Sequence, residues 1–327
     1  IKARFVVLAP GSEPVELQSL PFENNVINST EALKLEVLPR KLVVVGGGYI
    51  GLELGTAFAK MGSKVTVLEA SDQLLPQYDK EIADVVARSL KKRDVDVRLN
   101  TKAGALQKNG KALEAIDEKG ETTLIDADKV LVTVGRRPRL DGWGLRELQL
   151  TIRDGFIAID QECRTSMTDV FAIGDVTGEP MLAHRAMAQG AVVAELMAGK
   201  RRAFEPAAIP AVCFTDPEIV SVGQSPGEAE AAGLELSVGK FPLPVNGRAM
   251  TLQADAGFVR VVARKDNALV VGIQAVGKNI SEFASAFSLA LEMGACLEDI
   301  ASTIHAHPTQ GEGIQEAAMM ALGHGLH

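Results

Sequence analysis

A histidine and a glutamate near the end of the chain have the residue types and the spacing of an acid–base pair. His307 precedes Pro308, and Glu312 follows five residues after the histidine. Histidine changes charge near neutral pH, so it suits proton transfer to and from a group such as a thiol. A carboxylate partner fixes the ring tautomer and stabilises the protonated ring. The same pattern is typical of a structural His-Pro turn, whose peptide bond can be cis, so other signals must decide.

A glycine-rich segment at 46–55 is the strongest of those signals. Its pattern Gly46-x-Gly48-x-x-Gly51 follows an apolar strand predicted at 41–45 and begins a helix that we expect to reach about residue 61. Gly46 permits a tight turn, Gly48 lets a pyrophosphate approach the backbone, and Gly51 lets the helix pack closely on the sheet. The phosphates would bind the first N–H groups of the helix. The expected NAD contacts in this segment are Gly46, Gly47, Gly48, Tyr49, Ile50, Gly51 and Glu53, of which Tyr49 and Glu53 share one helix face.

An acidic residue at the end of the next strand selects between the two nicotinamide cofactors. Glu69 lies eighteen residues after Gly51, where a carboxylate accepts hydrogen bonds from ribose hydroxyls and repels a 2′-phosphate. No arginine follows it closely, so the sequence predicts NAD rather than NADP. Gly135, after another strand, would let the backbone approach the nicotinamide half, whereas Arg136 and Arg137 are equally compatible with surface charges.

A second nucleotide signature lies at 169–190. An apolar strand ends in Gly174-Asp175, and a helix is predicted to begin near Met181. A carboxylate after a glycine at the carboxyl end of a strand is well placed to bind a ribityl or ribose hydroxyl. The first N–H groups of the helix form a positive site for an anionic ring; they belong to Met181, Leu182, Ala183 and His184.

These segments together resemble the class I pyridine nucleotide-disulfide oxidoreductases, the flavoproteins that include glutathione reductase and dihydrolipoamide dehydrogenase. HPTQGE at 307–312 resembles the catalytic signature HPT-x-x-E of that family. The segments 291–307 and 214–223 resemble the dihydrolipoamide dehydrogenase branch in particular. The resemblance covers essentially all 327 residues.

The resemblance implies a set of roles. Asp175 and the backbone of Met181 to His184 would bind FAD, while His307 would be the base and Glu312 its orienting partner. The base would act across the interface of a homodimer on the redox disulfide of the other subunit. Electrons would pass from a dihydrolipoyl group through the disulfide and FAD to NAD. The substrate would be carried on the lipoyl domain of the acyltransferase component of a 2-oxo acid dehydrogenase complex. Glu53 would pair with a lysine beside the flavin, and Tyr49 would gate the flavin.

Two features depart from the family pattern. The first FAD fingerprint and the Cys-x4-Cys redox pair do not occur in these 327 residues, and we expect both upstream of Ile1. Ala9-Pro10-Gly11 stands where the family has Ala-Thr-Gly. Two alternatives therefore remain: an NAD-binding and dimerisation module without redox turnover of its own, or another NAD-dependent flavoprotein disulfide reductase. A glutathione reductase would carry arginines near Glu69, and a mercuric reductase would end in a cysteine pair.

Composition excludes several other classes. The net charge of −8, without a basic patch, disfavours nucleic acid and anionic membranes as partners. No apolar run reaches the roughly 18 residues of a membrane span. The three cysteines lie far apart, which favours incidental thiols in a cytosolic protein over a disulfide framework. We expect no metal site and a cytoplasmic, bacterial-type location, with the mitochondrial matrix as an alternative.

The predicted fold class is α/β followed by α+β. Residues 1–38 are expected to end a first FAD-domain segment, 39–155 to form a Rossmann-like parallel-sheet NAD domain, and 156–204 to form a second FAD segment. Residues 205–327 are expected to form a dimerisation domain with an antiparallel sheet. The predicted strands are 41–45, 64–69, 95–99, 112–118, 121–134, 212–222, 257–263 and 268–276, and the predicted helices include 79–92, 281–293 and 313–322.

Overall fold

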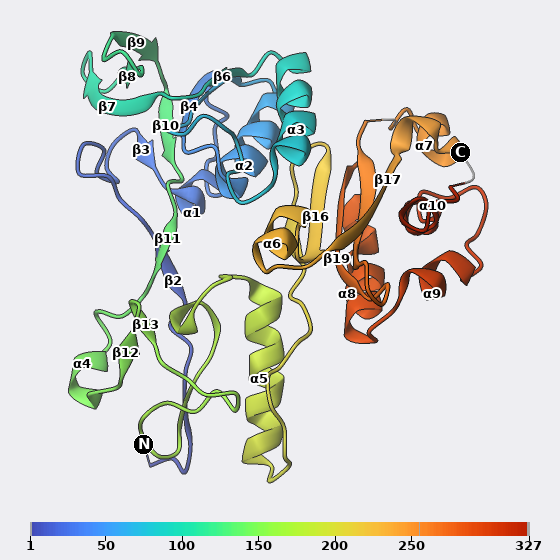
Figure 1. Ribbon diagram of the computed structural model, residues 1–327. Coiled ribbons are helices and arrows are strands. Elements are labelled where there is room, and N and C mark those ends of the chain that lie inside the picture. Colours follow the sequence, from blue (N-terminus) through green and yellow to red (C-terminus); the bar gives the residue numbers. More distant parts are fainter. Residues whose placement is uncertain (1, 255, 326–327) are drawn as a thin grey trace. The chain divides into compact units, whose positions relative to one another are not determined.

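The computed structural model describes residues 2–254 and 256–325, which form two compact units (Figure 1). The first unit contains the residues up to Val15 together with Gly135–Pro206. The second contains Glu16–Val134 together with the residues from Ala207 onward. The outer limits of the first and last expected segments, at 1 and 326–327, lie outside the described residues.

The first unit is built from short strand pairs and one long helix. β1 pairs with β14 in parallel, and the pairs β2–β11 and β12–β13 are antiparallel. A buried cluster around Phe171 and Val193 joins β14 to the helix. The helix begins at Ala183, two residues later than expected, because Leu182 is still extended. The elements are β1 Val6–Leu8, β2 Ser12–Pro14, β11 Arg136–Pro138, α4 Leu145–Leu148, β12 Ile152–Arg153, β13 Phe156–Ile157, β14 Val170–Ala172, the 3-10 helix η1 Gly174–Thr177 and α5 Ala183–Met197.

The second unit begins with a five-stranded parallel sheet in the order β3-β10-β4-β5-β6. Successive side chains of a strand point to opposite faces, so the valines of β4 divide between two cores: Val44 belongs to one cluster, and Val43 and Val45 belong to the other. This is the parallel sheet expected from the sequence. Its strands are β3 Val26–Ile27, β4 Lys41–Val45, β5 Lys64–Leu68, β6 Asp96–Arg98 and β10 Lys129–Val132. β3 lies within the segment 1–38 yet pairs with β10, and the four-segment division of the chain stays a proposal.

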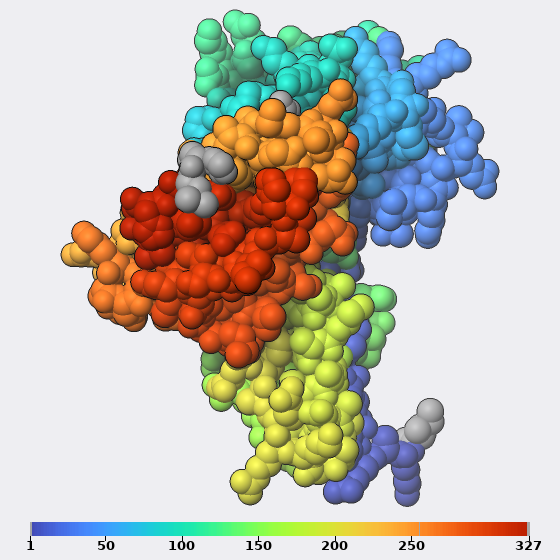
Figure 2. Space-filling view, turned by 90° about the vertical axis from the view of Figure 1, so that its right-hand side faces the viewer, coloured from blue at the N-terminus to red at the C-terminus, as the bar shows by residue number. Residues whose placement is uncertain are grey.

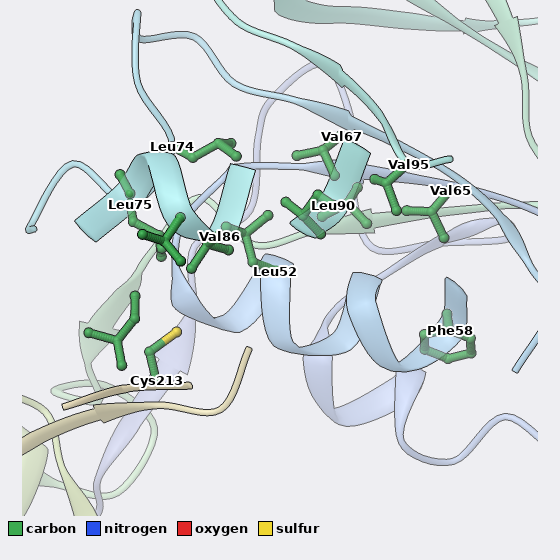
Figure 3. Packing of buried hydrophobic residues seen from close by; sticks show 14 of the residues in the cluster. Leu52, Phe58, Val65, Val67, Leu74, Leu75, Val86, Leu90, Val95 and Cys213 are labelled. Atoms are coloured by element: carbon green, nitrogen blue, oxygen red, sulfur yellow. The ribbon is translucent and has the colours of Figure 1, made fainter. Parts of the chain in front are cut away.

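Helices cover one face of this sheet, and a small antiparallel sheet covers the other. Figure 3 shows Leu52 of α2 and Leu90 of α3 in the packed layer on the helical side. The helices are α1 Ser29–Ala32, α2 Tyr49–Lys60 and α3 Lys80–Lys92. On the other side lie β7 Lys102–Gln107, β8 Ala112–Ile116 and β9 Thr122–Asp126.

The prediction of a single strand at 121–134 was wrong. The segment forms β9 and β10, which belong to different sheets. The break falls at Asp128, whose backbone N–H donates to the carbonyl of Lys41 and whose side chain accepts from the N–H of Lys41. β7 was not predicted, because its apolar alternation is weak.

The C-terminal part of the second unit is an antiparallel sheet in the order β15-β16-β19-β18-β17. The expected strand at 212–222 is in fact the antiparallel pair β15–β16. Pro217 has no N–H to continue a ladder, and the Thr215 hydroxyl donates to the Pro217 carbonyl at 2.7 Å. The expected β18–β19 hairpin is confirmed, and β17 was not predicted. The strands are β15 Ala211–Cys213, β16 Glu218–Gly223, β17 Leu236–Pro242, β18 Phe258–Arg264 and β19 Val270–Gly277.

Helices cover one face of this second sheet. Val259 and Val261 of β18 pack in that core, whereas the neighbouring Phe258 joins the cluster around α2 and α3. The expected helix at 281–293 is η3 followed by α8, the expected α10 is confirmed, and α9 was not predicted. The red surface in Figure 2 belongs to the last part of the chain, which includes α9 and α10. The helical elements are α6 Pro226–Ala231, η2 Leu243–Val245, α7 Gly247–Thr251, η3 Ile280–Phe283, α8 Ala284–Glu292, α9 Leu297–Ser302 and α10 Glu312–Ala321.

Among the residues that the structure describes, no helix is both long enough and apolar enough to cross a membrane.

Candidate active site and nucleotide-binding sites

Two glycines of the predicted NAD loop are required by the packing of the protein itself. Gly46 has a φ of +106°, and a Cβ there would lie 2.6 Å from the Thr133 carbonyl oxygen. A Cβ on Gly51 would lie 2.2 Å from the carbonyl oxygen of Gly46. These contacts are far below van der Waals distance, so α2 can approach β4 and β10 only through glycine.

Gly48 differs from both, because nothing in the protein demands a glycine there. Its φ of −76° suits any residue, and a Cβ would meet no atom within 4 Å. Gly48 is also the N-cap of α2, and no side chain caps the helix there. The empty space around Gly48 therefore lies at the start of the helix. Tyr49 and Ile50 form its first turn and are half-buried. An open cradle at a helix N-terminus fits a pyrophosphate, which supports the expected NAD site.

Glu69 organises this loop from the end of β5. Its Oε2 accepts the Gly47 N–H at 2.6 Å, and its Oε1 accepts the N–H and the hydroxyl of Ser71 at 2.8 and 2.5 Å. A carboxylate offers about four acceptor positions, so three are occupied and one remains on Oε2. The carboxylate can therefore fix the loop and still accept a bond from one ribose hydroxyl.

Glu69→Gln should relax the preference for NAD over NADP. The substitution removes the charge that repels a 2′-phosphate, and we expect the NADP-to-NAD ratio of kcat/KM to rise roughly five- to tenfold. Steady-state kinetics with both cofactors measure this ratio. Asp72→Asn is the matched control, because Asp72 is an exposed acid three residues after Glu69. An equal rise in both variants would contradict a specific role for Glu69.

Glu53 connects α2 to the strand pair β15–β16. Its Oε1 accepts the Phe214 N–H at 2.8 Å. Burial raises the pKa of Glu53, and the bond from Phe214 only partly offsets this. The neighbouring Cys213 is fully buried; burial, with the Glu53 charge as a second cause, raises the pKa of its thiol to about 12. Cys213 therefore stays a protonated thiol. None of these contacts involves a cofactor, so the expected NAD contact of Glu53 stays a prediction.

Gly135 belongs to the first unit, where its carbonyl accepts the Val15 N–H at 3.0 Å. Its expected contact with NAD stays a prediction.

The two arginines that follow Gly135 differ in role. Arg137 pairs with Glu13 at the surface, whereas the Nε of Arg136 donates to the Ser12 hydroxyl at 2.7 Å. Arg136 is thus half-buried and bonded to Ser12, whereas the sequence alone left open whether it was a surface charge.

Asp175 is held in place at the turn after β14. The Ser12 hydroxyl, itself bound by Arg136, donates to Asp175 Oδ2 at 2.5 Å. Ser12 uses one carboxylate oxygen, and a carboxylate has a second oxygen for a ribityl hydroxyl. The arrangement fits the FAD contact expected of Asp175.

The hydrogen bonds at the start of α5 show which of the other expected FAD contacts still have a free backbone N–H. The Met181 N–H already donates to the Glu179 carboxylate at 3.0 Å, and the Leu182 N–H donates to the Pro180 carbonyl at 2.9 Å. Ala183 is the first residue of the helix, so its N–H has no acceptor within the helix. The side chain of His184 is exposed. Ala183 is therefore better placed than Met181 or Leu182 to bind a ligand.

The structure brings His307 and Glu312 together. The Nδ1 of His307 lies 2.6 Å from Glu312 Oε1. The imidazole is 80% exposed, whereas the carboxylate is only 19% exposed. Burial acts to raise the pKa of Glu312, but the Thr309 N–H and His307 outweigh it, so the pKa lies below its ordinary value. With Nδ1 held by a charged carboxylate, the exposed ring offers Nε2 as a proton acceptor.

Three amide side chains, which the sequence did not single out, hold the loop that carries His307. The buried Asn246 donates to the Thr309 carbonyl at 3.1 Å, and the buried Gln310 donates to the Lys278 carbonyl at 3.1 Å. Gln315 donates to the carbonyls of Ala301 and Thr303. The bond between His307 and Pro308 is cis, as the sequence allowed.

The cysteines do not form a redox pair within the described residues. Cys163, Cys213 and Cys296 are all free thiols, and the first two are buried. Burial also raises the pKa of Cys163 to about 11. Neither buried thiol therefore has the low pKa of a reactive cysteine.

Comparison with known proteins shows the family. Residues 1–190 match the model of the pyridine nucleotide-disulphide oxidoreductases, and residues 209–318 match the dimerisation domain of the same family. The chain therefore belongs to the pyridine nucleotide-disulphide oxidoreductase family, and the dihydrolipoyl dehydrogenases of this family use FAD and NAD. This confirms the resemblance seen in the sequence.

Individual relatives show which branch of the family the chain resembles most. It is 58% identical to the dihydrolipoyl dehydrogenase of Pseudomonas aeruginosa over 100% of this chain and 70% of that protein. It is 46% identical to the dihydrolipoyl dehydrogenase of Geobacillus stearothermophilus over 98% of this chain and 69% of that protein. The crystal structure of LpdA from Mycobacterium tuberculosis superposes with a TM-score of 0.87 and 28% identity, covering 97% of this chain and 69% of that one. The dimerisation domain supports a homodimer.

Proposed function

We propose that the protein reoxidises dihydrolipoyl groups and delivers the electrons to NAD. The observation that carries this proposal is the exposed His307 ring, whose Nδ1 lies 2.6 Å from the Glu312 carboxylate. Dihydrolipoyl dehydrogenases with up to 58% identity to the whole chain support the choice of substrate.

Each proposed role follows from the chemistry of a side chain. His307 accepts the proton of the dihydrolipoyl thiol, and Glu312 stabilises the resulting positive charge. Gly46–Gly51 and Glu69 orient NAD, whereas Asp175 and the start of α5 orient FAD. When bound, the two cofactors supply electron and hydride transfer. The proposal also requires a redox disulfide between the thiol substrate and FAD, and Cys163, Cys213 and Cys296 are not paired to form one.

The proposal includes two partners, a second copy of the chain and a lipoyl domain of a 2-oxo acid dehydrogenase complex. The second copy is supported by apolar side chains that a monomer would leave in water: Leu289 and Met293 are exposed at α8, and Ile304 is 96% exposed beside the His307 loop. The lipoyl domain is proposed because the relatives are dihydrolipoyl dehydrogenases. A cytoplasmic location is proposed from the bacterial relatives.

NAD reduction by dihydrolipoamide tests the proposal. We expect the full-length protein to reduce NAD with dihydrolipoamide and to prefer it to glutathione or other thiols. Turnover with other thiols but not with dihydrolipoamide would instead favour another flavoprotein disulfide reductase.

The 327-residue chain alone is expected to bind NAD without turning over. The unpaired cysteines favour this second candidate function, in which the 327 residues are a module that binds NAD and dimerises. The same assay decides, because clear dihydrolipoamide-dependent NAD reduction by the 327 residues would refute the module.

A further inference from the structure

The turn that presents Asp175 takes most of its support from the side chains of α5. Glycines with positive φ stand at both ends of the turn, +76° at Gly174 and +137° at Gly178. Such a short 3-10 turn leaves backbone groups without regular partners. Gln189, which is fully buried, accepts the Gly174 N–H through its Oε1 at 2.7 Å.

Arg185 supplies the donors for the carbonyl side of the same turn. Its guanidinium donates to the Gly178 carbonyl at 2.9 Å, to the Gly174 carbonyl at 3.4 Å and to the Thr177 hydroxyl at 3.2 Å. Arg185 is only 8% exposed. Burying an arginine costs free energy unless its N–H groups are hydrogen-bonded. The acceptors of the turn provide these bonds, and they make the burial of Arg185 possible.

The Thr177 hydroxyl completes the contact. It donates to the Gly174 carbonyl at 2.8 Å and accepts from Arg185. Arg185 and Gln189 lie one helical turn apart on one face of α5, and both reach the turn that precedes the helix. They fasten Gly174–Gly178 to the first half of α5.

We propose that Arg185 is a positioning residue for FAD. By holding the Asp175 turn against α5, it fixes the spacing between two expected FAD contacts, the Asp175 carboxylate and the first N–H groups of the helix. Arg185 touches neither the cofactor nor the reacting atoms in this role. The proposal rests on FAD binding at Asp175 and α5, which is itself part of the proposed function.

Reconstitution with FAD tests this role in the full-length protein. FAD is removed, the apoprotein is titrated with FAD, and the dissociation constant is measured together with the visible absorption spectrum of the bound flavin. For Arg185→Met we expect the dissociation constant to rise about tenfold or more, because several charge-assisted bonds to the turn are lost. Arg185→Lys keeps a charged donor and should recover part of the affinity.

A matched control separates positioning from general stability. Arg202 is exposed and follows α5, where it pairs with Glu195 of that helix, so Arg202→Met removes an arginine bound to the same helix without touching the turn and should bind FAD within twofold of the parent. The melting temperatures of apoprotein and holoprotein are also compared, because loss of FAD affinity shrinks the difference between them. An Arg185→Met protein that melts lower but binds FAD within twofold of the parent would overturn the proposal.

Two further variants keep the result decisive. Asp175→Ala should weaken FAD binding by itself. If it does not, FAD lies elsewhere and the site assignment fails; if it does while Arg185→Met has no effect, only the positioning role fails. Should Arg185→Met not fold, Arg185→Gln removes the charge and shortens the side chain that reaches the turn, and an unchanged FAD affinity in that variant would refute the proposal.

Discussion

His307→Ala in the full-length protein is expected to lower kcat for dihydrolipoamide oxidation by about 10²- to 10⁴-fold. The substitution removes the group that accepts the thiol proton, and without it the substrate must lose that proton to water. NADH-dependent reduction of a dye should stay largely intact, because it needs only the nucleotide sites. Steady-state assays of both reactions on the same preparation measure the difference.

A neighbouring histidine provides the control. His305 lies two residues earlier in the same loop, and its Nδ1 is 2.8 Å from the Thr303 carbonyl rather than near a carboxylate. We expect His305→Ala to change kcat by less than about tenfold. If His307→Ala reduced the dye reaction as strongly as the thiol reaction, the loss would reflect the fold and the assigned role would be wrong.

The sequence predicted the glycine turn between β4 and α2 well because three constraints act there within a few residues. The apolar strand before Gly46, the helix after Gly48 and the close approach at Gly51 are all local, so the glycine pattern reports them directly. The separation of Val43 and Val45 from Val44 into two cores likewise follows from the alternation of side chains along a strand.

Strand boundaries were less predictable, because apolar runs do not show where a chain changes partners. The run at 121–134 crosses from one sheet to another, and the break depends on a hydrogen bond between Asp128 and the distant Lys41. The run at 212–222 turns back on itself at Pro217. A proline in that run was the available signal for the second break, and Asp126 and Asp128, a residue type that strands disfavour, were the signal for the first.

The supporting contacts of the site were the least predictable. Ser12 and Asp175 are 163 residues apart, and their hydrogen bond exists only because β2 and β14 belong to one compact unit. Arg185 was visible only as one charge in an apolar helix. Its burial against the Gly174–Gly178 turn depends on tertiary contacts. The best indication of that burial in the sequence was that Arg185 lies on the same helix face as Gln189.

The second large effect is expected from Gly48→Val, which should weaken NAD binding at least about 30-fold, or roughly 2 kcal/mol. The added side chain would occupy the open space at the start of α2, where the pyrophosphate is expected. Because a Cβ at Gly48 meets no protein atom within 4 Å and the φ is −76°, the fold itself should tolerate the change. Titration calorimetry gives the affinity, and thermal unfolding without NAD should show only a small fall in the midpoint, because valine is a poorer N-cap than glycine.

Gly51→Ala is the informative comparison, because its defect should be the reverse. A Cβ there lies 2.2 Å from a backbone oxygen of the loop, so we expect a loss of about 1–3 kcal/mol in the free energy of unfolding even without cofactor. The two glycines stand three residues apart in one motif, yet we expect Gly51 to serve the fold and Gly48 to serve the ligand. A Gly48→Val protein that binds NAD as tightly as the parent would place the pyrophosphate elsewhere, and would leave the openness at Gly48 without a function.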